Sequence, residues 1–186
     1  MQQQTAGQTT QTVKDFLADL DRYEERVPLD ELMHRLVNLE ISIDDVRKFV
    51  HFGRERYQRN LMHEGPGYQA LILCWRKGQR SPIHDHTGSS CGVRVLEGIA
   101  TETSFAQTPD GYVFATGSRE LPVGGVCGSQ DSDIHQVSNL QPGNADLVTL
   151  HVYSPPLLRM GMYSLTEHTV EEFLDPVVGF SDGAGI

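Results

Sequence analysis

Residues 78–98 read GQRSPIHDHTGSSCGVRVLEG, and this stretch contains two histidines separated by one residue. In an extended strand alternate side chains share a face, so His84 and His86 point the same way and Asp85 points the other way. Two imidazoles on one face are suited to bind one metal ion, whereas Asp85 is expected to have a supporting or structural role. The stretch therefore predicts a β-strand that contributes two ligands to a metal site.

A third ligand is expected from another strand, and His135 in the segment 131–139 is the best candidate. Taken alone, a histidine in a strand is more often a core or surface residue, and that alternative stays open for His135. Imidazole ligands accept zinc, copper, iron or nickel, so the ligand type does not select the metal.

Short β-branched or aromatic runs surround this stretch from about residue 60 onward, and Gly- and Pro-containing turns separate them. Their spacing of roughly ten residues is typical of a β-sandwich or a small barrel. The expected strands are Tyr68–Trp75, Gly92–Leu96, Ala100–Phe105, Tyr112–Ala115, Ile134–Val137, Asp146–Tyr153 and Met160–Leu165.

The N-terminal part of the chain has helical periodicity instead. A capping box that starts at Thr12 predicts a helix whose apolar stripe runs from Val13 to Tyr23, and a second helix is expected to begin near Pro28. Ser42 is expected to cap a third helix.

The ends of the chain are less regular. Residues 1–11 are Gln/Thr-rich and predict a flexible tail, and Thr169–Leu174 is expected to form a last helical turn. Together these patterns predict one mainly β domain over residues 1–186, with a helical cap over 12–55 and a β-barrel over 60–165.

The length, charge and composition of the chain argue against several classes of binding partner. A chain of 186 residues fits one domain, and 15 basic against 25 acidic residues give a formal charge of −10. An acidic chain without a Lys/Arg block argues against nucleic acid or membrane as partner, and no apolar run approaches the roughly 18–20 residues of a membrane span. We expect a small-molecule partner and a monomer.

Three cysteines without a CxxC pair, and no signal-peptide pattern at the start, favour the cytoplasm.

The central stretch resembles the first motif of the cupin superfamily, in which Gly, His-x-His, Glu and Gly follow at fixed spacing. The two glycines and the histidine pair keep that spacing, but Cys91 stands where the family has a metal-ligand glutamate. His135 and Asn139 fit the end of the second cupin motif. The resemblance implies a jelly-roll barrel with an internal metal. With three imidazoles and no carboxylate, such a site stays cationic and suits an anionic substrate such as a thiolate.

A closer resemblance is to the cysteine dioxygenase family. Four stretches carry it, in the order and spacing of the family. The resemblance implies non-haem Fe(II) as cofactor, dioxygen as co-substrate, and conversion of L-cysteine to cysteine sulfinic acid. The stretches are YQRNL at 57–61, LILCW at 71–75, SPIHDHTGSSC at 81–91 and LHVYSPP at 150–156.

The resemblance also implies roles for individual residues. His84, His86 and His135 match the iron ligands. Arg59 matches the arginine that binds the substrate carboxylate, and the neighbouring Tyr57 is expected to contribute to substrate binding. A solvated surface charge is the alternative for Arg59.

Tyr153, His151 and Cys91 are the residues that the resemblance places in catalysis. Thr149, His151 and Tyr153 alternate, so a strand puts a hydroxyl, an imidazole and a phenol on one face, where they form a hydrogen-bond relay that fixes the phenol. The alternative is a core tyrosine with His151 as its partner. Cys91 matches a cysteine that, in animal members, is joined to the tyrosine by a thioether, and a buried free thiol is the alternative. The bond between Ser154 and Pro155 matches one that is cis in the family.

Three functions remain open from the sequence. The first is cysteine dioxygenase, and the second is a dioxygenase for another small thiol such as mercaptosuccinate or 3-mercaptopropionate. Relatives that act on 3-mercaptopropionate tend to have glutamine in place of the arginine, so Arg59 argues against that substrate but not against mercaptosuccinate. The third is a non-catalytic metal-binding cupin, against which the Tyr153–His151 pair argues, because binding alone does not need an oriented phenol.

Overall fold

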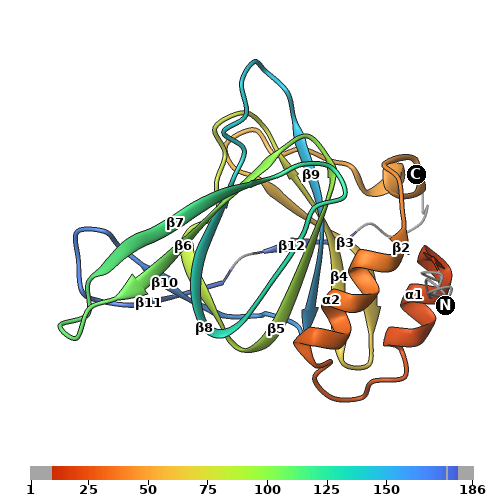
Figure 1. Ribbon diagram of the computed structural model, residues 1–186, viewed down its shortest axis with the longest axis horizontal. Helices are drawn as coiled ribbons and strands as arrows, with labels where there is room; N and C mark the ends of the chain where they lie inside the picture. The colour runs from red at the N-terminus through yellow and green to blue at the C-terminus, as the bar shows by residue number, and fades with distance from the viewer. Residues whose placement is uncertain (1–9, 175, 180–186) are drawn as a thin grey trace, which may run out of the picture.

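A ten-stranded sheet curls into a barrel within residues 10–174 and 176–179, the part of the chain that the computed structural model describes (Figure 1). Two helices cover one side of the barrel, and the hairpin of β6 and β7 extends on the other side. The elements in chain order are β1 (Gln11–Thr12), α1 (Val13–Leu20), α2 (Leu29–Asn38), β2 (Leu39–Glu40), the 3-10 helix η1 (Asp44–Phe49), β3 (Gln58–Gly65), β4 (Tyr68–Trp75), β5 (Ile83–Glu97), β6 (Ala100–Gln107), β7 (Val113–Leu121), β8 (Val126–Ser138), β9 (Leu147–Ser154), β10 (Met160–Tyr163), β11 (Glu171–Phe173) and β12 (Val177–Val178).

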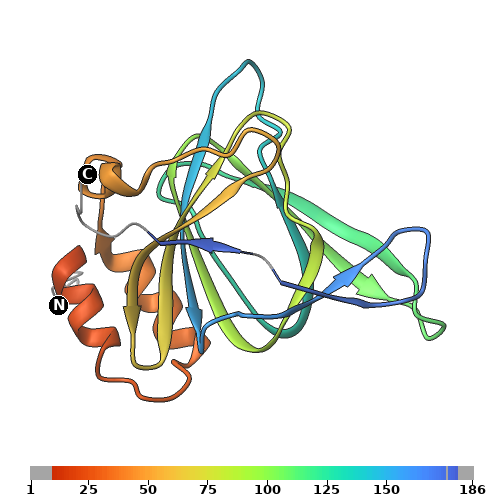
Figure 2. The ribbon, with the colours of Figure 1, turned by 180° about the vertical axis from the view of Figure 1, so that it is seen from behind.

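The long strand β5 occupies the middle of the sheet. The strand order is β12-β3-β4-β9-β5-β8-β6-β7, and β10 pairs with the start of β5 and with β11. The register of β5 against β8 shifts on both sides of His86. Such bulges bend a strand and increase its twist, which helps a sheet to curl. The view from behind shows β12 beside β3, at the opposite end of the strand order from β7 (Figure 2).

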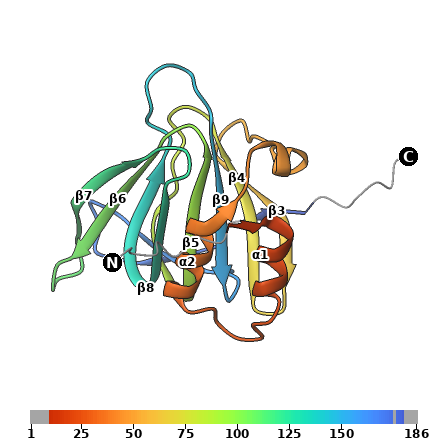
Figure 3. The same ribbon diagram turned by 45° about the vertical axis from the view of Figure 1, so that its right-hand side comes forward.

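Strands β4 and β9 are buried along their whole length because each faces two apolar layers. On β4, Ala70 and Ile72 pack in one cluster with the helices, whereas Leu71 and Leu73 pack in a second cluster inside the barrel. Figure 3 shows α1 and α2 in front of the strands that they cover. This alternation sends every second side chain of β9 into the barrel, which is where the candidate site lies.

Helix α2 lies close to the sheet because two glycines face it. A Cβ atom built on Gly92 of β5 would lie 2.9 Å from Cγ of Leu32, and one built on Gly128 of β8 would lie 2.5 Å from Sδ of Met33. Real Cβ atoms do not approach other heavy atoms so closely. The missing side chains therefore let the helix pack directly on the strands that carry the three histidines.

All seven strands expected from the sequence overlap strands of the structure, and the mainly β prediction is confirmed. Thr12 caps α1, since its hydroxyl accepts from the backbone N–H of Asp15 at 3.2 Å. The expected third helix is a short 3-10 helix, the form that often connects larger elements. In the expected tail, residues 1–9 lie outside the described residues, whereas Gln11 belongs to β1, which pairs with β2.

The expectation of a helical turn over Thr169–Leu174 is wrong. Glu171–Phe173 forms strand β11, which pairs antiparallel with β10, and β12 follows at Val177–Val178. The sheet therefore continues beyond residue 165. None of the helices in the described part of the chain combines the length and the apolar character that a membrane span requires.

Candidate metal centre

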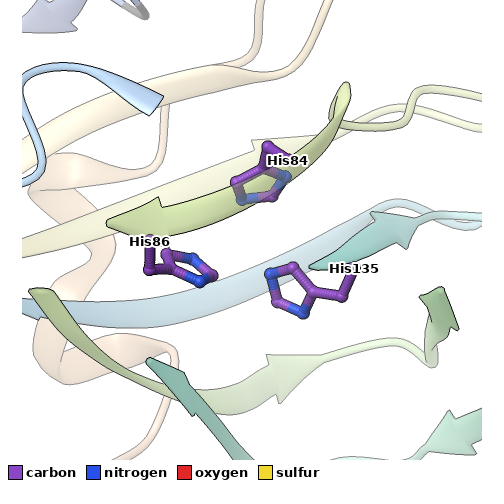
Figure 4. Close-up of side chains that lie close together, drawn as sticks. All are labelled: His84, His86 and His135. Carbon is purple, nitrogen blue, oxygen red and sulfur yellow. The ribbon is translucent and has the colours of Figure 1, made fainter. Parts of the chain in front are cut away.

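His84, His86 and His135 converge inside the barrel, as Figure 4 shows. His84 and His86 lie on β5, and His135 on β8 is the register partner of His84. The ring centroids are 4.8 to 4.9 Å apart, and one ligand atom from each residue lies within 4.8 Å of the others. All three side chains are buried, so the expected convergence of the three imidazoles is found.

Two of the histidines have a fixed proton position. The Nδ1 atom of His84 lies 3.0 Å from the carbonyl oxygen of Pro82, and the Nδ1 atom of His135 lies 3.0 Å from Oε1 of Glu102. A carbonyl and an ionised carboxylate only accept hydrogen bonds, so each Nδ1 carries the proton and donates it. The Nε2 lone pairs of His84 and His135 then remain available for a metal ion.

His86 has the same division of its ring nitrogens. Its Nδ1 lies 3.2 Å from the hydroxyl oxygen of Ser129, whereas Nε2 is buried and has no hydrogen-bond partner among the described residues. Burial of a polar atom without a hydrogen-bond partner costs free energy, so we infer that this nitrogen binds a ligand such as a metal ion. Three imidazole nitrogens fit a divalent metal such as zinc, copper, iron or nickel.

Burial keeps two of these histidines neutral. It lowers the pKa of His84 to about 3, with a further contribution from neighbouring His135. Burial also lowers the pKa of His86 well below its usual value, and the nearby His84 adds to the effect. Neutral imidazole is the form that binds a metal ion, so burial keeps these two side chains in the protonation state that metal binding requires.

A chain of hydrogen bonds lies beside the histidines on β9. Trp75 donates its indole N–H to the hydroxyl of Thr149 at 2.9 Å, and that hydroxyl lies 3.0 Å from Nε2 of His151. Nδ1 of His151 lies 3.1 Å from the hydroxyl of Tyr153. The relay expected from the alternation of the three residues is present, and it holds the phenol with its ring 6.0 Å from that of His86.

Cys91 lies next to this tyrosine. The two residues are register partners on β5 and β9, and Cys91 is fully buried. Burial raises the pKa of its thiol to about 12, although the positive charge of Arg59 and a hydrogen bond with Tyr153 act in the opposite direction. Cys74 and Cys127 are also buried.

Arg59 and Tyr57 reach the site from β3 and the segment before it. Arg59 is only 2% exposed, and its guanidinium carbon lies 5.2 Å from the centroid of the Tyr153 ring. Tyr57 is buried and stacks on Trp75, with 4.2 Å between ring centroids. A small cavity of about 10 Å³ is lined by Tyr57, Leu73, Trp75, Ser81, His84, His135, Val137, His151, Tyr153 and Met160.

Asp85 points away from the histidines, as the strand alternation predicts. Its carboxylate accepts from the backbone N–H of Gly161 at 3.1 Å, from the hydroxyl of Tyr163 at 2.8 Å and from Thr87. The carboxylate fastens β10 to β5, and it does not join the three imidazoles.

Sequence reasoning missed Glu102 on β6. Its carboxylate contacts His135 and also accepts from Nε of Arg119 at 2.7 Å. Burial alone would raise the pKa of Glu102, but the hydrogen bonds with His135 and Arg119 outweigh it and lower the pKa to about 2. The available signal was a carboxylate two residues after Ala100, which places both on the inward face of an expected strand.

Comparisons with known proteins agree with this geometry. The family described as cysteine dioxygenase type I matches residues 1–166. A cysteine dioxygenase type 1 from Danio rerio is 32% identical over 162 residues, which cover 83% of this chain and 80% of that protein. One from Homo sapiens is 34% identical over 137 residues, which cover 71% and 68%.

Solved structures support the barrel. The protein TT1209 from Thermus thermophilus superposes with a TM-score of 0.51 at 17% identity, covering 62% of this chain and 99% of that one. An uncharacterised Klebsiella pneumoniae protein with a double-stranded β-helix domain gives a TM-score of 0.50 at 16% identity, covering 67% and 96%. At such low identity these likenesses show the fold alone, and that fold is the cupin barrel expected from the sequence.

Proposed function

This chain belongs to the cysteine dioxygenase type I family and is a thiol dioxygenase, and from this premise we propose that it oxidises L-cysteine to cysteine sulfinic acid with dioxygen and Fe(II). The observation that carries the proposal is the convergence of three imidazoles from β5 and β8 inside the barrel. His84, His86 and His135 would hold the iron. When bound, Fe(II) would supply the redox chemistry that joins dioxygen to the substrate sulfur.

The charge of the ligand set favours a thiolate substrate. Three imidazoles add no negative charge, and Asp85 is engaged with β10 instead. A divalent ion held by these ligands keeps its two positive charges in a buried site, where an anionic partner is strongly attracted.

Arg59 supplies the second recognition element in this proposal. Its guanidinium lies inside the protein beside Tyr153, and a guanidinium binds a carboxylate through two parallel charge-assisted hydrogen bonds. A substrate that carries both a thiolate and a carboxylate would then be fixed at both ends. Tyr57, which stacks on Trp75, lines the small cavity that His84, His135 and Tyr153 also line.

Tyr153 is the residue that would face the reacting atoms. The relay through His151 and Thr149 holds its hydroxyl, so the phenol meets the substrate without a loss of side-chain freedom. The position of Cys91 opposite Tyr153 supports a thioether between the two side chains. Intact mass of denatured, turned-over enzyme tests this link, because the bond removes two hydrogen atoms and an unmodified mass contradicts it.

The test of the function combines iron analysis with dioxygen uptake across a panel of thiols. Uptake with L-cysteine, and little with the other thiols, supports the proposal. Bound iron without uptake of dioxygen for any thiol would overturn it and favour a metal-binding protein without catalysis.

Mercaptosuccinate is a second candidate substrate, and a charged groove favours it. A groove of about 360 Å³ is lined by Arg59, Arg54 and Arg56, and also by Glu55. The three arginines outnumber the one carboxylate, so on a chain with a formal charge of −10 this lining has a positive formal charge, which suits a second carboxylate on the substrate. The same panel decides between the candidates, because higher kcat/KM for mercaptosuccinate than for L-cysteine would reassign the substrate.

A further inference from the structure

Glu102 uses one carboxylate oxygen for His135 and the other for two nitrogens of Arg119, Nε at 2.7 Å and Nη2. Oε1 accepts from Nδ1 of His135 at 3.0 Å, and Oε2 lies 2.6 Å from Nη2 of Arg119. The side chain of Glu102 is 5% exposed, whereas that of Arg119 is 59% exposed. The carboxylate is therefore buried between the imidazole and a guanidinium that reaches solvent.

The three histidines differ in what holds them from behind. His84 donates to the neutral carbonyl of Pro82, and His86 contacts the neutral hydroxyl of Ser129. His135 is the one of these three that contacts a carboxylate. A carboxylate behind a ligating histidine fixes the tautomer and orientation of the ring, and it raises the basicity of the nitrogen that faces the metal.

A second cavity lies behind His135. It has a volume of about 230 Å³, and its lining includes Glu102, Arg119, Ser129 and His135. His135 also lines the small cavity beside Tyr153. Without Arg119, this cavity would give Glu102 room to turn away from the imidazole toward solvent. The double contact with Arg119 removes that freedom.

We propose that Glu102, clamped by Arg119, is a positioning residue that sets the tautomer and the ligand strength of His135 and so tightens metal binding at the three-histidine centre. The inference rests on the proposed metal centre, but it does not depend on which thiol is oxidised. Glu102 supplies a negative charge that the three imidazoles lack. Because this charge lies one hydrogen bond behind His135, it does not occupy a coordination position that a substrate needs.

The test measures metal affinity of the metal-free protein, with Co(II) as the probe and its visible absorption as the signal. Glu102→Gln keeps the shape of the side chain and removes its charge, and we expect affinity to fall by about 10- to 100-fold together with a changed Co(II) spectrum. The Glu102→Asp variant keeps the charge, so it should bind Co(II) more tightly than the Glu102→Gln variant. Glu120→Gln is the matched control, since Glu120 is exposed on β7 directly after Arg119.

Arg119→Gln tests the clamp without changing Glu102, and it covers the case in which Glu102→Gln fails to fold. We expect Arg119→Gln to weaken Co(II) binding by less than Glu102→Gln but more than Glu120→Gln. The inference would be overturned if Glu102→Gln had the same Co(II) affinity and spectrum as the unchanged protein. If Glu102→Gln fails to fold, the same result for Arg119→Gln would overturn it. Failure of the unchanged protein to bind Co(II) would instead overturn the metal centre itself.

Discussion

Arg59 is the single residue on which recognition of a substrate carboxylate depends in the proposed function. A charge-assisted contact of this kind is worth roughly 1.5–3 kcal/mol, which corresponds to about 10- to 150-fold in a binding constant. We predict that Arg59→Ala lowers kcat/KM for L-cysteine by at least that range and leaves iron content unchanged. Steady-state dioxygen uptake and iron analysis measure both quantities. Arg22→Ala, at an exposed arginine on the helical side, is the control.

Thr149 holds the relay behind Tyr153. Thr149→Val keeps the shape of the side chain but leaves the N–H of Trp75 and Nε2 of His151 without this partner. Each buried polar group left unpaired costs about 1–3 kcal/mol, so the free energy of unfolding should fall and kcat should fall more than KM changes. Thr149→Ser keeps the hydroxyl and should restore both values. Equal stability and kcat in the Val and Ser variants would contradict the relay.

Single-strand patterns predicted some of these residues and missed others for a physical reason. Alternation along β5 and β9 put His84 with His86 and His151 with Tyr153, because side-chain direction follows from the strand itself. Glu102 was missed because its role depends on which strand lies beside which. The pairing of β6 with β8 brings Glu102 to His135, and no pattern within either strand predicts that pairing.

At the scale of elements, α2 keeps its position because Gly92 has no side chain. A Cβ atom there would press on Leu32 and Leu36, so Gly92→Ala should lower the free energy of unfolding by about 1–3 kcal/mol, the usual cost of overpacking. Urea unfolding measures this change. Gly117→Ala on the exposed strand β7 is the matched control, because its Cβ would meet nothing within 4 Å.

Adding Leu36→Ala to Gly92→Ala tests the same contact further. Removal of the Leu36 side chain makes room for the new methyl group, so the two changes together should cost less than the sum of their separate costs. Additive effects, or no loss of stability in Gly92→Ala, would show that α2 does not need this close approach.

The elements also show where sequence patterns stop being informative. The helices were predicted from local signals such as the Thr12 cap, which the structure contains. Thr169–Leu174 fits a helical turn or a short strand equally well by pattern, and its pairing with β10 decides in favour of the strand. Strand β3 was missed as well, since the Arg59–Leu61 stretch alternates poorly and is defined by its pairing with β4.

At the scale of the whole molecule, buried neutral histidines link folding to pH. Burial lowers the pKa of His84 to about 3 and lowers the pKa of His86 and of His151 well below the usual value of 6.5. In the unfolded chain each imidazole regains a pKa near 6.5. Below pH 6.5 the unfolded state therefore binds more protons than the metal-free native state, and stability falls as the pH falls.

Three such groups set the size of the effect. Each extra proton bound by the unfolded state changes the free energy of unfolding by about 1.4 kcal/mol per pH unit, so these three imidazoles together should destabilise the metal-free protein by at most about 4 kcal/mol per pH unit as the pH falls below 6.5. Urea unfolding at a series of pH values measures this slope. The His151→Gln variant should show a smaller slope, because this position no longer titrates. A slope that His151→Gln does not alter would mean that this imidazole is already protonated in the folded protein, and the neutral relay behind Tyr153 would then be wrong.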